Sequence, residues 1–385
     1  MKSSTINDRK YLYTRKLEKI LFYLLVLIFP FSLLLGQAPI IIDHNSTDLS
    51  GIPAEWIDSA KSDLFIAYGH TSHGSQLISG MDALESFYSS GQYNWSHTGG
   101  EDELHLFEGD GYGDGYLDHD CGYAGWDDET REYLDLFPTC NVMVWSWCGQ
   151  VNSVDLTNHY LNPMQQLEAE YPNVKFVYMT GHLEGQGPNG SLFLANQQIR
   201  DFCSTHNKIL FDFADIEKYS PDADTNFQLY NATDACDYDH PGGMTRNWAV
   251  DWINNNPTDE LTQINQHCTA CAHSENLNCV KKGMAAWWMW ARLAGWQGQN
   301  TAINQNAVSD IKLYPNPVKA ILHIENIKSA NQLIITDARG IIKLNKTIKN
   351  NKGLQLDLEG FASGIYTIQI LDNNGNIFQS LFIKQ

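Results

Sequence analysis

The chain has 385 residues, of which 43% are hydrophobic and 18% charged, a composition typical of a globular protein able to bury a sizeable core. Its net charge of −20 is unevenly distributed, because residues 37–307 contain ten basic and 37 acidic residues and so carry −27. A region this acidic repels phosphate backbones and anionic lipid, so we do not expect the protein to bind nucleic acid.

The first segment has the parts of a secretory signal. Six basic residues precede or border an apolar stretch of 16 residues at positions 20–35, and the small residues Gly36 and Ala38 follow it. A membrane span usually needs about 18 or more apolar residues. We expect residues 1–37 to be a signal peptide whose removal leaves no integral membrane span. A retained N-terminal anchor is the alternative.

Apolar runs then alternate with helical patterns. Runs at residues 64–68, 141–147, 174–179 and 209–213 predict buried strands, and apolar spacings of three and four predict helices near residues 75–90, 127–137, 155–170 and 191–206. This alternation predicts a parallel sheet covered on both faces, a three-layer α/β/α fold. A last helix over residues 282–296 carries four tryptophans, which we expect to pack in the core.

The loop after the first predicted strand carries candidate catalytic residues. Open α/β sheets bind ligands at the carboxyl ends of their strands, and Ser72 lies in such a loop, between His70 and His73. Ser72 is the candidate nucleophile and Ser75 is the alternative. A serine here can also simply cap the next helix.

Two further loops follow strands at the same edge. Gly149, Gln150 and Asn152 come after the second strand and are candidate donors to an oxyanion, together with backbone N–H groups at Ser72 and Gly74. An ordinary loop with a disulfide is an equally open interpretation. His182 follows the third strand and is a candidate for substrate contact, as are His70 and His73.

Residues 101–135 contain thirteen acids and one Lys or Arg. Their Asp- and Gly-rich part, from Asp110 to Asp118, is compatible with a structural calcium ion, although the spacing fits no EF-hand. A solvated acidic loop is the favoured interpretation. No cofactor is otherwise expected.

All eight cysteines lie in the central region. Export favours disulfides over free thiols. A zinc site at Cys268, Cys271, His273 and Cys279 is the alternative.

Near the end of the central region, the carboxylate of Asp237 and the imidazole of His240 lie three residues apart in the sequence. A serine hydroxyl becomes a nucleophile when a histidine takes its proton and a carboxylate holds the imidazole ring. Ser72, His240 and Asp237 therefore form the expected catalytic set.

The succession of strands, serine loop and Asp-x-x-His before a final helix is similar to the SGNH (GDSL-like) hydrolases, over roughly residues 60–296. The resemblance implies a flavodoxin-like, SGNH-type domain and a serine esterase. It departs from the family motif at His70-Thr71-Ser72, where the family has Gly-Asp-Ser. Asp237-Tyr238-Asp239-His240 matches the family's last block in full.

A polar stretch predicts a linker over residues 297–308, and short alternating runs then predict a small all-β sandwich over residues 309–385. Leu313-Tyr314-Pro315-Asn316-Pro317 and the closing Phe382-Ile383-Lys384 resemble the C-terminal sorting domain of type IX secretion cargo in Bacteroidetes-type bacteria. The resemblance implies passage through the type IX machinery to the cell surface or the medium. A generic adhesive β module is the alternative.

We therefore expect residues 38–296 to be a secreted esterase acting on acylated carbohydrate or another extracellular ester. Two alternatives stay open. A His and Asp loop cluster (His70, His73, His182, Asp237, Asp239 and His240) has the ligand types of a metal-dependent hydrolase. A non-catalytic surface protein would instead bind glycans through its aromatic residues.

Overall fold

The computed structural model describes residues 38–109, 115–298, 312–325, 330–337, 342–348, 353–372 and 377–385. It divides into two compact units, one ending at Ala294 and the other beginning at Gly295. The expected signal peptide, most of the expected linker, and Asp110 and Asp114 of the possible calcium loop lie outside the described residues.

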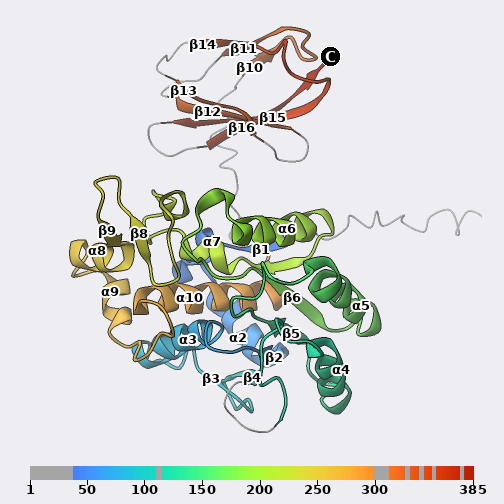
Figure 1. The fold of residues 1–385 in the computed structure, drawn as a ribbon, viewed down its shortest axis with the longest axis vertical. Coiled ribbons are helices and arrows are strands. Elements are labelled where there is room, and N and C mark those ends of the chain that lie inside the picture. Colours follow the sequence, from blue (N-terminus) through green and yellow to red (C-terminus); the bar gives the residue numbers. More distant parts are fainter. Residues whose placement is uncertain are drawn as a thin grey trace, which may run out of the picture. The chain divides into compact units, whose positions relative to one another are not determined.

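A seven-stranded sheet forms the centre of the N-terminal unit, and all its strand pairs are parallel (Figure 1). Across the sheet the strands are β1 (Ile40–Ile42), β7 (Ile209–Phe211), β6 (Lys175–Met179), β5 (Val142–Trp145), β2 (Phe65–Gly69), β4 (Leu104–Glu108) and β3 (Trp95–Ser96). The four strands predicted from apolar runs are confirmed. These runs are almost wholly buried, as parallel strands covered on both faces must be.

Helices cover both faces of this sheet, which confirms the α/β class (Figure 1). One layer contains α2 (Ala54–Asp63), α3 (Ser75–Phe87) and α10 (Asn276–Leu293), and the other contains α4 (Trp126–Leu136), α5 (Asn162–Glu170) and α6 (Ser191–Thr205). The shorter helices are α7 (Phe213–Glu217), α8 (Trp248–Asn255) and α9 (Glu260–Asn265). The tryptophans of the α10 segment are buried, as expected.

Helices α3 and α10 approach each other at two glycines. A Cβ atom added to Gly80 would lie 1.9 Å from the carbonyl oxygen of Cys279, and one added to Gly283 would lie 2.2 Å from the carbonyl carbon of Gly80. Only glycine permits this backbone contact. Because it occurs within two turns of the first residue of each helix, the loops that precede α3 and α10 are brought together.

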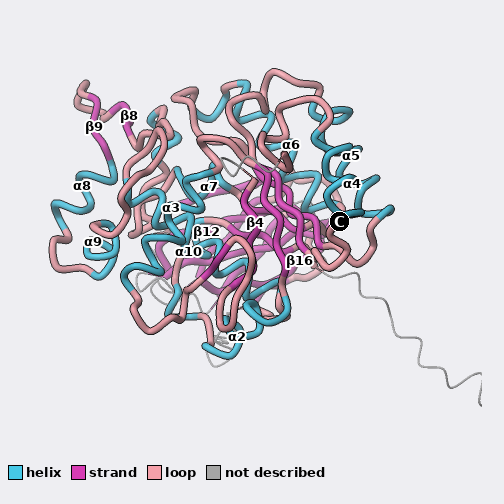
Figure 2. The backbone as a smooth tube through the Cα atoms, turned by 90° about the horizontal axis from the view of Figure 1, so that it is seen from below, coloured by secondary structure: helices cyan, strands magenta, loops and turns pink. Residues whose placement is uncertain are grey.

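The segment around Asp237 forms a hairpin instead of the expected loop. Strands β8 (Asp237–Asp239) and β9 (Thr245–Asn247) pair antiparallel, and Figure 2 shows them projecting at the margin of the unit beside α8. Tyr238 turns inward and packs with Phe227 and Trp248. The buried Tyr238 lies between a partly buried Asp237 and an exposed Asp239, the period-two alternation of a strand with one face covered.

The structure contains one disulfide among the residues it describes, between Cys271 and Cys279. The remaining six cysteines are free thiols, and five of them are buried. The expected set of disulfides is therefore limited to this one, which joins the loop before α10 to the first turn of that helix. It also occupies two of the proposed zinc ligands.

The C-terminal unit is all-β, as predicted. One antiparallel sheet contains β10 (Lys312–Tyr314), β11 (Ile321–Glu325) and β14 (Gly353–Asp357), and the other contains β13 (Ile342–Thr347), β12 (Ala330–Asp337), β15 (Gly364–Asp372) and β16 (Ile377–Lys384). Leu322 and Leu356 of the first sheet share a buried cluster with Ile335 and Ile368 of the second. Across all described residues, no helix is long and apolar enough to span a membrane.

Candidate active site

The loop after β2 is held by buried polar contacts that leave Ser72 and His73 at its tip. Nε2 of His70 lies 2.9 Å from a carboxylate oxygen of Glu108, and the hydroxyl of Thr71 donates to Asp120 at 2.7 Å. A Cβ atom on Gly74 would lie 2.3 Å from that of His70, so a side chain there would displace the loop. Glycine is therefore required where the loop turns into α3.

The loop after β5 supplies a thiol. β5 is the direct neighbour of β2 in the sheet, so the loops at the two carboxyl ends meet. Sγ of Cys148 lies 3.2 Å from Nδ1 of His73 and 3.4 Å from Oγ of Ser72. Cys148 is half-buried, whereas the other free cysteines are buried.

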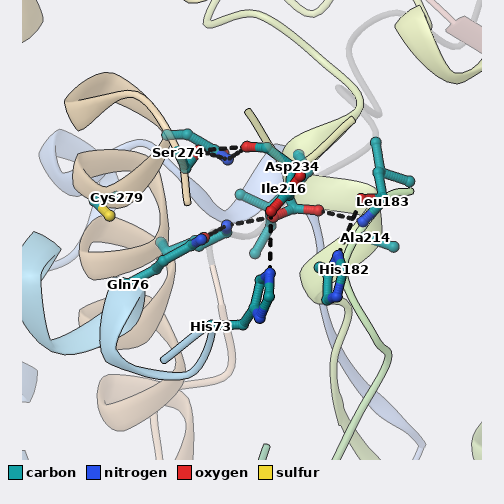
Figure 3. Close-up of polar contacts among 12 residues, drawn as sticks. His73, Gln76, His182, Leu183, Ala214, Ile216, Asp234, Ser274 and Cys279 are labelled. Carbon is teal, nitrogen blue, oxygen red and sulfur yellow. Dashed lines mark hydrogen bonds and ion pairs between the residues drawn. The ribbon is translucent and has the colours of Figure 1, made fainter. Parts of the chain in front are cut away.

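The opposite nitrogen of His73 contacts a carboxylate. Nε2 of His73 lies 3.0 Å from Oδ2 of Asp234 (Figure 3). Asp234 is placed by its backbone, since its N–H donates to the carbonyl of Leu183 at 3.0 Å and its own carbonyl accepts from Ser274. Thiol, imidazole and carboxylate thus form one continuous path of contacts, the arrangement of a nucleophile, a base and an orienting acid.

The charges in this path support one another. The hydrogen bond from His73 outweighs burial and lowers the pKa of Cys148 to about 6. Burial acts to lower the pKa of His73, but hydrogen bonds to Asp234 and Cys148 prevail and raise it to about 9. The pKa of Asp234 is lowered because its bond to His73 overcomes the effect of burial. At neutral pH the site therefore holds a thiolate beside an imidazolium.

The imidazole of His73 lies between two other imidazoles. The ring of His182 stacks on it with centroids 3.7 Å apart and an interplanar angle of 3°, and the ring of His273 lies at 4.5 Å and 14°. The loops before α3, after β6 and before α10 thus each contribute one ring. This packing fixes the plane of the His73 ring, and so the direction of both its nitrogens.

Ser72, His240 and Asp237, the expected catalytic set, form no hydrogen bonds with one another among the described residues. His240 accepts at Nδ1 from the N–H of Gly242, and Asp237 accepts from Asn247, both in the hairpin region. The hydroxyl of Ser72 contacts Cys148 instead. Ser75 donates to the carbonyl of Ser72 at 2.7 Å.

The residues expected to donate to an oxyanion after β5 are Gly149, Gln150 and Asn152, and they have different partners in the structure. The side-chain oxygen of Gln150 accepts from the N–H of Cys148 at 3.0 Å and so holds the thiol loop. Asn152 donates to Ser191, the first residue of α6, at 3.1 Å. Gly149 has φ of +84°, a left-handed conformation that favours glycine, and adjoins the thiol.

The structure also places three possible metal ligands together, His73, His182 and Asp234, with one polar atom of each within 4.8 Å of the others. An ion must lie near the plane of each imidazole that binds it. Two parallel rings 3.7 Å apart cannot both contain one ion in their planes, because it would lie about half that spacing out of each, close to a whole Zn–N bond of about 2.0–2.1 Å. In this arrangement the set does not fit a shared ion.

The other residues of the expected metal cluster have different partners. His70 bonds to Glu108, and Asp239 accepts from Asn231 at 2.8 Å. A second group of ligand types, Asp43, His44 and Asp215, lies near the start of the unit. There, Asp215 already contacts both His44 and Lys218.

Three residues near His73 were not assigned to this site from the sequence: Cys148 as a free thiol, Asp234, and His273, which was considered only as a zinc ligand. Cys148 does directly follow a predicted strand at the edge that carries His73, and this position was a usable signal. Asp234 and His273 lie in irregular segments, where no sequence periodicity indicates their place.

Comparison with known proteins identifies the C-terminal unit. Residues 312–384 match the family model of the secretion system C-terminal sorting domain. This confirms the sorting domain predicted from the tail, and implies export through the type IX machinery to the cell surface or the extracellular space. No curated protein matches the chain.

Among solved structures, the chain is similar to PorZ, an essential bacterial surface component of the type IX secretion system of Porphyromonas gingivalis. The identity is 18%, the match covers 23% of this chain and 13% of PorZ, and the TM-score is 0.18. A likeness at this level carries no conclusion about the fold or the function of the N-terminal unit.

Proposed function

We propose that the N-terminal unit is an exported hydrolase of carboxylic esters, with the thiolate of Cys148 as its nucleophile. The observation that carries this proposal is the path of contacts from Cys148 through both nitrogens of His73 to Asp234. Thiolates are strong nucleophiles when a neighbouring imidazolium lowers their pKa. Cys148 takes the place expected for Ser72 because the sulfur, and not the serine oxygen, contacts the imidazole.

The order of the strands supports a relation to the SGNH-type hydrolases. Strands β4, β2, β5, β6 and β7 lie side by side, which in chain order is 2-1-3-4-5, the order of flavodoxin-like sheets. The contacts of Cys148 and His73 lie at the carboxyl ends of the central pair of strands, β5 and β2, where such sheets bind ligands. This unit would then be a variant of that fold with a thiol nucleophile.

The geometry supplies each part of an acylation step. The thiolate attacks the ester carbonyl carbon, and the C=O electron pair moves to the oxygen. The N–H groups of Ser72 and Gly74, which donate to no described residue, lie at the start of the 13-residue helix α3 and are available to that oxyanion. The C–O bond then breaks, His73 gives its Nδ1 proton to the departing alkoxide, and an alcohol and a thioester on Cys148 result.

The proposed substrates are acylated carbohydrates or other extracellular esters. Support comes from export by the sorting domain and from the resemblance to SGNH hydrolases, some of which are carbohydrate esterases. A cavity of about 570 Å³ in the same unit is lined by other residues, including Tyr88, Tyr93 and Glu260, and not by the thiol path. The thiol of Cys148 is half-buried at the edge of the sheet, outside that cavity.

The test is hydrolysis of a panel of acetylated sugars and 4-nitrophenyl esters by the purified full-length protein. We expect Cys148→Ala to abolish turnover and Ser72→Ala to retain most of it, with Cys203→Ala, which removes a buried thiol, as the matched control. Turnover that survives Cys148→Ala and is lost in Ser72→Ala would overturn the thiol assignment. If the wild-type protein hydrolyses none of these esters, the assignment as an esterase is wrong.

A further inference from the structure

His182 places a ring nitrogen without a hydrogen bond at the proposed site. Its Nδ1 lies 3.0 Å from the carbonyl oxygen of Leu183, and because a carbonyl only accepts, Nδ1 must carry the ring proton. In the neutral ring, Nε2 is then an acceptor. That atom is buried, with no hydrogen-bond partner among the described residues, and the residue is only 7% exposed.

A buried network fixes the segment that holds this ring (Figure 3). The N–H of Leu183 donates to Glu217 at 2.7 Å, and the other carboxylate oxygen of Glu217 accepts from Lys282 at 2.6 Å. Lys282 also contacts Gln76, one residue into α3, and Gln76 donates to the carbonyl of Ala272 beside His273. The three imidazole-bearing loops are therefore tied to one buried ion pair, which is fully enclosed.

The free nitrogen faces the chain next to the thiol. A Cβ atom on Gly149 would lie 3.7 Å from Nε2 of His182, and Gly149 directly follows Cys148. The same point lies 3.8 Å from a carboxylate oxygen of Glu184, so Gly149 presents no side chain to either group. Both nitrogens of His73 are already engaged, one with Cys148 and one with Asp234. Nε2 of His182 makes no hydrogen bond among the described residues, and its nearest acidic neighbour is a carboxylate oxygen of Glu184 at 3.9 Å, beyond hydrogen-bond distance.

We propose that Nε2 of His182 is the base for the second half of the reaction, which hydrolyses the acyl group from Cys148. This rests on the proposed function. A water molecule gives a proton to Nε2 while its oxygen bonds to the thioester carbonyl carbon. The C–S bond then breaks and its electron pair returns to sulfur as the thiolate. The carboxylic acid leaves, His182 gives its proton to solvent, and His73 takes one up, so the starting charges are restored.

The test is pre-steady-state hydrolysis of 4-nitrophenyl acetate by the full-length protein, with intact-mass measurement of the quenched enzyme. His182→Phe keeps a flat ring over His73 without the nitrogen, and His182→Gln keeps a donor for the Leu183 carbonyl. In both variants we expect a burst of about one equivalent of nitrophenol and steady turnover lower by about 10²–10⁴-fold. Acetyl–Cys148 should accumulate, and hydroxylamine, which needs no base, should restore turnover. His273→Phe, at the other stacked ring, should show no burst.

Equal loss of burst rate and steady turnover in both His182 variants would overturn this inference alone, since it would show a general effect on the site. So would unchanged turnover. A wild-type protein that hydrolyses no ester, together with His182 variants in which Cys148 is never acetylated, would overturn the proposed function and this inference with it. The two failures are distinguishable, because wild-type turnover is lost only in the second.

Discussion

Sγ of Cys148 lies 3.2 Å from Nδ1 of His73, although the two residues are 75 positions apart in the chain. The contact exists because β2 and β5 are neighbours in the sheet, and each residue lies in the loop that leaves one of these strands. The pairing of a thiol with an imidazole therefore follows from strand order. Its chemistry follows from the third member, Asp234, which keeps His73 protonated.

The first prediction concerns pH. The lowered pKa of Cys148, about 6, means that the thiolate forms as the pH rises through that value. The raised pKa of His73, about 9, means that the proton needed by the leaving group is lost only above that value. We expect kcat/KM for an ester to rise near pH 6, stay level, and fall near pH 9. A single rise centred near pH 8.5, the pKa of an ordinary thiol, would contradict the ion pair.

Asp234 and Asp237 are three residues apart, and we predict that only Asp234 acts on His73. Asp234→Asn removes the charge that holds the His73 proton, so we expect kcat to fall by about 10²–10⁴-fold and the alkaline limb of the profile to move to lower pH. Asp237→Asn is the matched control, because Asp237 bonds to Asn247 in the hairpin region. A large loss in Asp237→Asn with little effect of Asp234→Asn would reverse the assignment.

The third prediction concerns stability. Lys282→Met leaves the carboxylate of Glu217 buried without its cation, which should lower the free energy of unfolding by about 3–5 kcal/mol in urea denaturation. Lys208→Met removes a partly exposed pair with Glu168 and should cost about 1 kcal/mol or less. Similar effects of the two variants would show that the buried pair does not support the fold.

The fourth prediction concerns metal removal. Because the parallel rings of His73 and His182 do not suit a shared ion, we expect ester hydrolysis to be unchanged after dialysis against EDTA and unaffected by added Zn²⁺ at equimolar concentration. Activity that disappears on chelation and returns with one metal ion per chain would instead require the His182 ring to turn, and would favour a metal-dependent hydrolase.

The sequence predicted the parts of the fold that follow from local pattern. The apolar runs that became β2, β5, β6 and β7 are long, buried and bounded by loops, and the turn-separated alternation of the tail indicated its strands. β4 was missed because its Leu-His-Leu-Phe-Glu run lies in an acidic stretch, and β1 because only three isoleucines form it. Strand order, which brings the thiol to His73, depends on long-range packing that no local pattern encodes.

The candidate site was predicted in part. Ser72, His73 and His182 were placed at the correct edge because each follows a predicted strand, and the structure gathers these loops. The acid was sought at Asp237, because Asp-x-x-His matched a family motif. The carboxylate that reaches His73 is Asp234, three residues earlier, since the following segment pairs with β9 as a hairpin. Which of two nearby acids points inward is decided by backbone contacts such as that of Asp234 with Leu183.

The most direct test of the thiolate is the rate at which iodoacetamide alkylates Cys148, followed by peptide mass spectrometry from acidic to alkaline pH. We predict that Cys148 reacts selectively, because the other free thiols are buried, and that its rate reaches half its plateau near pH 6. His73→Gln should move that midpoint toward the value of an ordinary cysteine, about 8.5. A midpoint near 8.5 in the wild-type protein, unmoved by His73→Gln, would contradict the account.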